Sequence, residues 1–144
     1  MTDDPTRPEL EELTDEECWQ LASTRSVGRY AANRRGLGPL VVPVNYTVDA
    51  DRTVVFRTGP GAKLATVGQG LAVIQVDEID PLHRTGWSVM IEGATRWLYE
   101  EQDQTPVEPW APGRREYIVR LTPVRISGRR IHLPLGDTDD RGYR

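Results

Sequence analysis

The sequence has little of several residue types, and each scarcity excludes a class of protein. Its 144 residues include one cysteine, Cys18, so no internal disulfide forms, which is compatible with a reducing compartment. No apolar run reaches the length of about 18 residues that a membrane-spanning helix needs. The only histidines, His83 and His132, lie about 50 residues apart without ligand spacing, so we expect no metal site.

The charge is unevenly distributed along the chain. Eight acidic residues and one basic residue within residues 1–17 give −7, and the total is −4, so the remainder carries +3. A mildly basic body suits a small anion better than DNA, which needs a dense basic face. The N-terminus lacks the apolar core of a signal peptide. We therefore expect a cytoplasmic protein with neither nucleic acid nor membrane as partner.

The length fits a single domain, flanked by an acidic tail at residues 1–12 and a polar, mobile tail at residues 134–144. Within residues 13–133, the capping-box pair Thr14 and Glu17 predicts a helix over residues 14–25, and a second short helix is expected over 62–67. Alternation, apolar runs and turn residues predict strands at 27–33, 40–48, 53–58, 71–76, 87–99, 117–121 and 124–131. Six or seven short strands with two short helices indicate a mainly β fold, a barrel rather than a parallel sheet.

Apolar patterning assigns faces to three of these strands. In the strand 40–48, Val42, Val44, Tyr46 and Val48 share one face. The run 71–76 is almost continuously apolar and is expected to be buried on both faces. A polar loop is expected over residues 77–84, and every second residue from Trp87 to Gly93 falls on one face.

The segment from Phe56 to Leu64 carries the clearest chemical signal. Glycines after a strand let backbone N–H groups approach a ligand closely, and the helix that follows presents its unpaired N–H groups. Lys63 lies in the first turn of that helix, where a cation opposes the helix dipole and a bound anion would relieve the conflict. Arg57 and Thr58 could add donors. Taken alone, such a fragment is more often an ordinary hairpin exit with a solvated lysine, and it has no Walker A spacing.

The order and spacing of several segments resemble the pyridoxamine 5′-phosphate oxidase-like flavin proteins, in particular a short actinobacterial branch. The segments are Val41–Tyr46, Val54–Leu64, Thr85–Val89 with Gly93, and Pro109–Gly113. The resemblance extends from about Leu13 to Ile131. It implies a six-stranded split β-barrel with short flanking helices. It also implies a homodimer with FMN held between the subunits.

The resemblance further implies which residues form the cofactor site: Val44, Asn45, Tyr46, Arg57, Thr58, Ala62, Lys63, Leu64, Trp87, Ser88 and Trp110. Residues 44–46 would lie along the isoalloxazine ring, and residues 57–58 would contact the ring edge or ribityl chain. Lys63 and its neighbouring N–H groups would hold the phosphate. Residues 87–88 would complete the site, often from the other subunit, and Trp110 would close over it. Tyr46 and Trp87 could equally be barrel core.

The implied activity is a flavin-dependent oxidoreductase acting on a small organic substrate. No catalytic side chain is assigned, because hydride chemistry resides in the cofactor. The chain is too short for the C-terminal segment that binds vitamin B6 substrates in the full-length oxidases, so that reaction is not expected. The alternatives are a reductase that uses the deazaflavin F420 and a non-enzymatic flavin-binding protein. Haem ranks last, since the two histidines are the only strong axial ligands.

Overall fold

A computed structural model describes residues 7–103, 105–107 and 116–133. The described chain forms seven strands and two helices: β1 (Glu9–Glu12), α1 (Asp15–Ala22), β2 (Val27–Ala32), β3 (Leu40–Val48), β4 (Val54–Thr58), α2 (Ala62–Ala65), β5 (Leu71–Asp80), β6 (Thr85–Tyr99) and β7 (Tyr117–His132). None of the helices in these ranges has the length and apolar character needed to cross a membrane.

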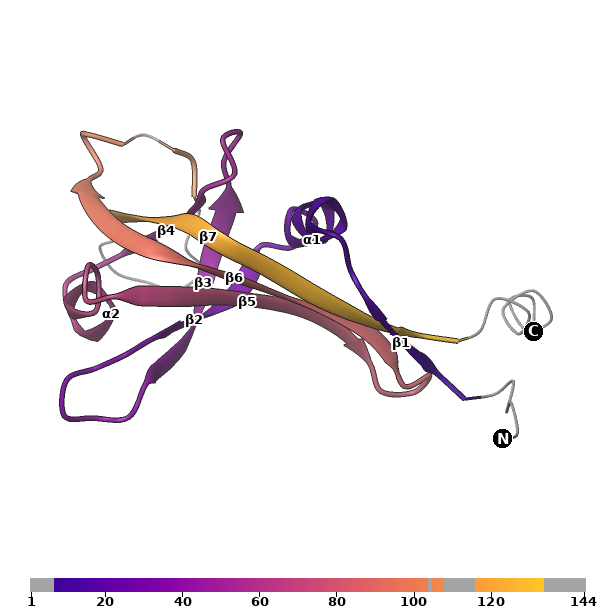
Figure 1. The fold of residues 1–144 in the computed structure, drawn as a ribbon. Coiled ribbons are helices and arrows are strands. Elements are labelled where there is room, and N and C mark those ends of the chain that lie inside the picture. Colours follow the sequence, from indigo (N-terminus) through magenta and orange to yellow (C-terminus); the bar gives the residue numbers. More distant parts are fainter. Residues whose placement is uncertain (1–6, 104, 108–115, 134–144) are drawn as a thin grey trace.

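The strands form one antiparallel sheet that closes on itself (Figure 1). The order β7–β4–β3–β2–β5–β6 is completed by pairing of β6 with β7, which gives a six-stranded barrel. β1 is a seventh strand that pairs with the C-terminal end of β7, from Glu9 opposite His132 to Glu12 opposite Arg129. The predicted mainly β, six-stranded barrel is therefore confirmed, and the acidic N-terminal segment contributes an additional strand.

The core fills the interior of the barrel. Tyr30, Phe56, Ile74 and Ile91 are fully buried there, and the rings of Tyr30 and Phe56 lie 5.0 Å apart between centroids. The inner face predicted for β6 is confirmed, because its alternate residues from Trp87 to Gly93 are all buried. Burying such apolar side chains is the main source of folding free energy.

Helix α1 adds one side of its surface to this core. Cys18, Trp19 and Ala22 are buried against the barrel. The predicted capping box is present: the Glu17 N–H donates to the Thr14 hydroxyl over 3.2 Å, and the Thr14 N–H donates to the Glu17 carboxylate over 3.0 Å. The helix ends at Ala22, earlier than predicted. The reciprocal cap fixes where the chain enters the helix.

The C-terminal strand differs from the prediction, because β7 is one long strand and not two. Pro123, which lies between the two predicted strands, belongs to β7 and is opposite Gly93, where the β6–β7 register shifts between Glu92 and Gly93. A proline, which cannot donate to the ladder, is tolerated at such an irregularity. The Thr122 carbonyl oxygen lies only 2.1 Å from where a Cβ at Gly93 would be. The glycine therefore allows the close backbone approach that keeps β7 continuous.

Strand β5 corrects two further predictions. It continues through Asp80, although residues 77–84 were expected to be a loop. The acidic residues at its end pair with arginines, Asp77 with Arg29 over 3.1 Å and Glu78 with Arg25. The strand is also not buried on both faces. Leu71 on one face is 50% exposed, whereas Ala72, Ile74 and Val76 on the other face are buried in the core. An apolar run alone does not distinguish a doubly covered strand from the wall of a small barrel.

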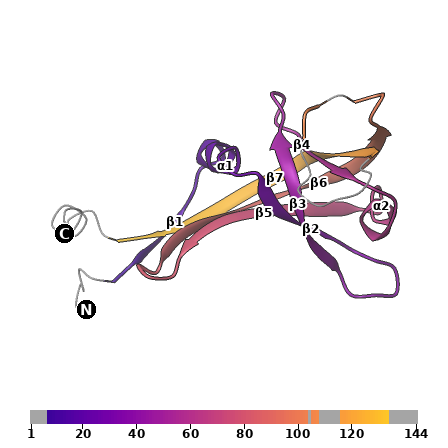
Figure 2. The same cartoon turned by 180° about the vertical axis from the view of Figure 1, so that it is seen from behind.

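The two ends of the molecule differ in shape. The β5–β6 hairpin, the end of β7 and β1 extend together as an arm beyond the barrel, as both Figure 1 and Figure 2 show. Helix α2 and the loop between β2 and β3 lie at the opposite end. The predicted site residues are consequently divided between two distant regions.

Candidate functional site

The glycine turn after β4 leads directly into α2. The Thr58 side chain is buried, and its hydroxyl donates to the Gly59 carbonyl over 3.0 Å. Gly61 has a φ of 142°, a conformation that glycine adopts at little cost and other residues rarely take. The Ala65 N–H donates back to the Gly61 carbonyl over 3.0 Å, so the helix begins at this glycine. The sequence-predicted turn is present as expected.

A buried hydrogen bond fixes α2 on the barrel. The Thr66 hydroxyl, directly after the helix, lies 2.7 Å from the Tyr30 hydroxyl and donates to the Lys63 carbonyl over 2.6 Å. Burial in this position raises the pKa of Tyr30, so the phenol stays neutral. The backbone of the Lys63 turn is therefore attached to the core, and a ligand held there would have a fixed position.

A hollow of about 880 Å³ lies beside α2. One wall is formed by α2 and the residues after it, and the other by the loop between β2 and β3. The lining residues are Asn33, Arg34, Arg35, Leu37, Ala62, Ala65, Thr66 and Gln69. Lys63 and Leu64 are half-buried and are not part of this lining. The turn thus borders a space large enough for a ligand.

Strands β3 and β4 place the next predicted residues side by side, with Tyr46 opposite Phe56 in the ladder. Val44 and Tyr46 belong to the core, and the Tyr46 hydroxyl donates to the Ala22 carbonyl. Burial raises the pKa of that phenol. Outside the barrel, β3 therefore offers a ligand its backbone and the half-buried Asn45. On β4, half-buried Arg57 forms an ion pair with Glu100.

Trp87 and Ser88 lie on the arm, far from α2 within one protomer. In the ladder Trp87 pairs with Glu78, seven residues along β5 from Leu71, which at the usual rise per residue is about 23 Å. Trp87 is 8% exposed, and the Arg25 guanidinium lies 5.9 Å from the centroid of its ring. Trp110 falls outside the described residues. The fold of one chain therefore does not bring Trp87 and Ser88 to the Lys63 turn.

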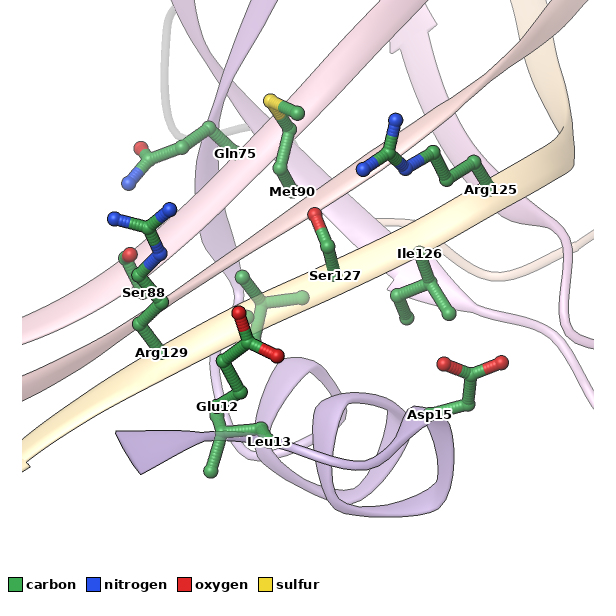
Figure 3. A pocket seen from close by; sticks show the side chains of 12 residues that line it. Glu12, Leu13, Asp15, Gln75, Ser88, Met90, Arg125, Ile126, Ser127 and Arg129 are labelled. Carbon is green, nitrogen blue, oxygen red and sulfur yellow. The ribbon is translucent and has the colours of Figure 1, made fainter. Parts of the chain in front are cut away.

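Ser88 borders a second hollow, of about 600 Å³, on the side of β6 and β7 (Figure 3). Figure 3 shows Arg125, Ser127 and Arg129 arrayed along β7 beside Ser88 and Met90 of β6. Arg125 and Arg129 were not among the site residues expected from the sequence. Arg125, Ser127 and Arg129 follow one another at intervals of two residues, which puts them on one face of the strand, and this spacing was the signal that could have grouped them.

A polar network fixes the segment after β6 against β4 and β7. The Arg120 guanidinium contacts Asp103 over 2.6 Å, Asp49 over 2.8 Å and the Thr105 hydroxyl over 2.6 Å. These charge-assisted bonds hold the pKa of the Asp103 carboxyl at about 2 and raise the pKa of Arg120. Val107, in the same segment, is buried against Val55 of β4 and Ile118 of β7. The region that leads towards residues 108–115 is thereby anchored.

The donor set can be compared with what a phosphorylated cofactor requires. Lysine and arginine side chains and the backbone N–H groups of a glycine turn are suited to binding a phosphate. Side-chain amide and hydroxyl groups are suited to the polar edge of a ring. The residues around α2 and β3–β4 supply both kinds, so they fit such a molecule. Within the described ranges no three His, Cys, Asp or Glu side chains gather as a metal site would require.

The closed six-stranded barrel, with a glycine turn and a short helix after β4, defines a class, the split-barrel proteins. The sequence profile of the pyridoxamine 5′-phosphate oxidase family matches residues 14–130. This chain therefore belongs to the pyridoxamine 5′-phosphate oxidase family.

Individual proteins are similar to this chain over most of its length. The uncharacterized protein Rv0080 of Mycobacterium tuberculosis is 29% identical over 133 residues, which covers 85% of this chain and 86% of that protein. The FAD binding protein from Mycobacterium smegmatis is 28% identical with a TM-score of 0.65, covering 86% of this chain and all of that one. The FAD-binding protein from Mesorhizobium loti, 24% identical with a TM-score of 0.69, covers 87% of this chain and 98% of its own, and supports the fold alone.

Proposed function

We propose that this protein binds a flavin nucleotide through its FMN moiety and serves as an oxidoreductase for small organic substrates. The observation that carries the proposal is the glycine turn with Lys63, fixed on the barrel through Thr66 and bordered by a hollow of about 880 Å³. Membership of the family supports it. So does the relative from Mycobacterium smegmatis, which is described as an FAD binding protein.

The residues of one protomer would divide the cofactor between them. Lys63, with the N–H groups of Ala62 and Leu64, would hold the phosphate. Arg57, Thr58 and Asn45 would contact the ribityl chain and the ring edge. Because the side chains of Val44 and Tyr46 are buried, they would contribute through the backbone of β3 along the ring. Trp110 would close over the bound cofactor.

The separation of Trp87 and Ser88 from α2 favours a homodimer. Trp87 and Ser88 are about 23 Å along β5 and β6 from the end near α2, so they would reach a flavin only from a partner protomer. The arm that carries them extends away from its own barrel (Figure 2). In a two-fold dimer each arm would complete the site of the other protomer.

A bound flavin would supply hydride transfer, which no side chain of this protein can perform. The protein would contribute binding, orientation and exclusion of water. Tyr30 and Tyr46 stay neutral at ordinary pH because their pKa values are raised by burial, and both serve as hydrogen-bonding anchors inside the barrel. No proton transfer from a titratable side chain is needed for this role.

The absorption spectrum of the purified protein tests the proposal. We expect a yellow protein with a flavin band at about 450 nm, and release of the flavin on denaturation, because a bound cofactor copurifies when it is held tightly. Reconstitution with FMN should restore the band. A colourless protein that does not bind added flavin would contradict the proposal.

The arginines near α2 favour one alternative, a reductase that uses the deazaflavin F420, whose long acidic tail they could hold. Titration with F420 and FMN under the same conditions decides between them, and tighter FMN binding excludes the F420 alternative. A non-enzymatic flavin carrier is distinguished by reducing the bound flavin and adding quinones or nitro compounds. Rapid electron transfer to these acceptors would exclude a carrier.

A further inference from the structure

The hollow bordered by Ser88 has two walls of opposite charge. Its volume of about 600 Å³ is within the range of small-molecule sites. Arg125 and Arg129 of β7 form the basic wall, and Glu12 and Asp15 of the β1–α1 segment form the acidic wall. Figure 3 shows the two acidic side chains coming from the side of α1 and the two guanidinium groups turned away from that segment. Charged groups of both signs therefore line one space.

The two walls do not neutralise each other. Glu12 lies opposite Arg129 in the β1–β7 ladder, and Glu92 lies opposite Arg125 in the β6–β7 ladder. Within the described residues, no ion pair joins either arginine to these two carboxylates or to Asp15. The charged groups of both walls are therefore available to a ligand.

Apolar side chains make up part of the remaining lining. Leu13 and Val89 are buried, Ile126 of β7 is half-buried, and Met90 of β6 is 41% exposed. A hydrocarbon part of a ligand would be removed from water against these side chains, which favours binding in proportion to the area covered. The hollow therefore offers two kinds of charged contact and an apolar surface.

A ligand with a single charge matches only one of the walls. A simple carboxylate would be attracted by the arginines of β7 and repelled by the acids of the β1–α1 segment, and a simple amine would experience the reverse. A molecule that carries both a carboxylate and an ammonium group, with a hydrocarbon part between them, would be attracted by both walls. The charge pattern thus selects for a ligand with both groups.

We propose that this hollow binds a small amino acid whose carboxylate and ammonium groups are separated by a hydrocarbon chain. The two arginines of β7 hold the carboxylate, the two acids of the β1–α1 segment hold the ammonium group, and the chain packs against Met90 and Ile126. Ser88 also belongs to the proposed flavin site, so this ligand would lie beside the flavin as the substrate of the proposed oxidoreductase. That role rests on the proposed function, whereas binding in the hollow does not require a flavin.

Three ligands of equal chain length test the charge pattern: 6-aminohexanoate, hexanoate and hexylamine. Two-dimensional NMR of the isotope-labelled full-length protein at low ionic strength gives both the affinity and the location of binding. We expect 6-aminohexanoate to bind about tenfold more tightly than either singly charged ligand, because each exposed charge pair changes the affinity by up to a few-fold. Equal binding of hexanoate or hexylamine, or no signal changes at Ser88, Met90 and Ser127, would overturn the inference.

Two double variants test the walls separately. Arg125→Gln/Arg129→Gln should lower the affinity for 6-aminohexanoate about tenfold, to that for hexylamine, and Glu12→Gln/Asp15→Asn should lower it to that for hexanoate. Arg96→Gln is the matched control, because Arg96 is exposed on β6 and lines neither hollow, and it should change none of the affinities. An equal loss in this control would show an effect of overall charge and overturn the inference. Thermal unfolding checks each fold, and if a double variant does not fold, the three-ligand comparison on the unmodified protein decides alone.

The flavin absorbance of the same samples separates this inference from the proposed function. Protein that binds 6-aminohexanoate but no flavin would contradict the proposed function and leave the amino acid site in place. Protein that carries a flavin and binds none of the three ligands would contradict the amino acid site alone.

Discussion

Lys63 is the residue on which the cofactor proposal depends most directly. Replacing it by alanine removes the cation proposed to contact the phosphate, and we expect flavin binding to weaken by roughly 1.5–3 kcal/mol, the range for hydrogen bonds to charged groups. The fold should survive, because the hydrogen bond between Thr66 and Tyr30 fixes α2 on the barrel. Flavin titration gives the affinity and circular dichroism the fold. Lys63→Arg, which keeps the charge, should retain most of the binding, and unchanged affinity in Lys63→Ala would show that the phosphate lies elsewhere.

Asp103 provides a test of stability that is independent of any ligand. Its carboxyl has a pKa of about 2, below the usual value near 4, and a carboxyl with a lowered pKa stabilises the fold above its unfolded pKa. The stabilisation is about 2 kcal/mol at pH 7 and is lost as the pH falls from about 4 to about 2. We therefore expect Asp103→Asn to lower the free energy of unfolding by about that amount at pH 7.

Urea unfolding at several pH values measures this difference. The difference in unfolding free energy between the two proteins should narrow as the pH falls from about 4 to about 2, because the unfolded carboxyl takes up its proton near pH 4 and the native carboxyl only near pH 2, where it resembles the amide. Glu101→Gln, at an exposed position in the turn after β6, is the control and should leave the free energy of unfolding nearly unchanged at each pH. A gap that stays constant down to pH 2 would exclude a linked carboxylate as its source.

At the scale of the elements, alternation and turn residues were sufficient to predict most strands. Strand β3 has the predicted bounds, and the capping box was visible in the sequence because its two hydrogen bonds are local. The wrong division of β7 into two strands has the opposite origin. Whether a proline ends a strand depends on the residue across the ladder, here Gly93 at a sequence separation of 30 residues, and no local pattern contains that information.

Gly93→Ala tests this explanation of the continuous β7 strand. The added Cβ would meet the Thr122 carbonyl oxygen and carbon at 2.1 and 2.7 Å, contacts with backbone that cannot rotate away. We expect a loss of about 3 kcal/mol or more in the free energy of unfolding, at or beyond the upper end of the range for overpacked cores. Gly38→Ala is the control, since nothing lies within 4 Å of its added Cβ, and chemical denaturation should show little change. Equal effects of both substitutions would contradict a steric role for Gly93.

The site could be predicted only in part for a related reason. The Lys63 turn is a contiguous segment, so its glycines and cation were recognisable in the sequence. The hollow beside it is not, because Arg34 and Arg35 come from a loop about 30 residues earlier and meet α2 only after the barrel closes. The faces of β3 were predicted correctly, but an apolar face suits a core and a ring wall equally. Burial in the structure was needed to place Val44 and Tyr46 inside.

At the scale of the whole molecule, the two halves of the proposed site lie at opposite ends of one protomer, α2 at one end and the arm with Ser88 at the other (Figure 1). Two protomers related by a two-fold axis would place each arm beside the partner's α2 and give two equivalent sites. A site shared in this way makes a prediction about mixed dimers that a site within one protomer does not make.

Lys63→Ala damages the phosphate side of a site, and Ser88→Trp fills the opposite side with bulk. At a flavin concentration well above the dissociation constant of the unmodified site and well below that of either variant, each variant alone should form dimers that hold almost no flavin. When the two are unfolded together and refolded at equal amounts, half of the dimers contain one protomer of each kind. In such a dimer one site carries both changes and the other carries neither, so about one quarter of all sites should bind flavin. Flavin content of mixed dimers, isolated with a different affinity tag on each variant, measures this directly as one flavin per dimer. Mixed dimers that form and remain without flavin would place Lys63 and Ser88 in the same protomer's site or in no common site, and would rule out the shared arrangement.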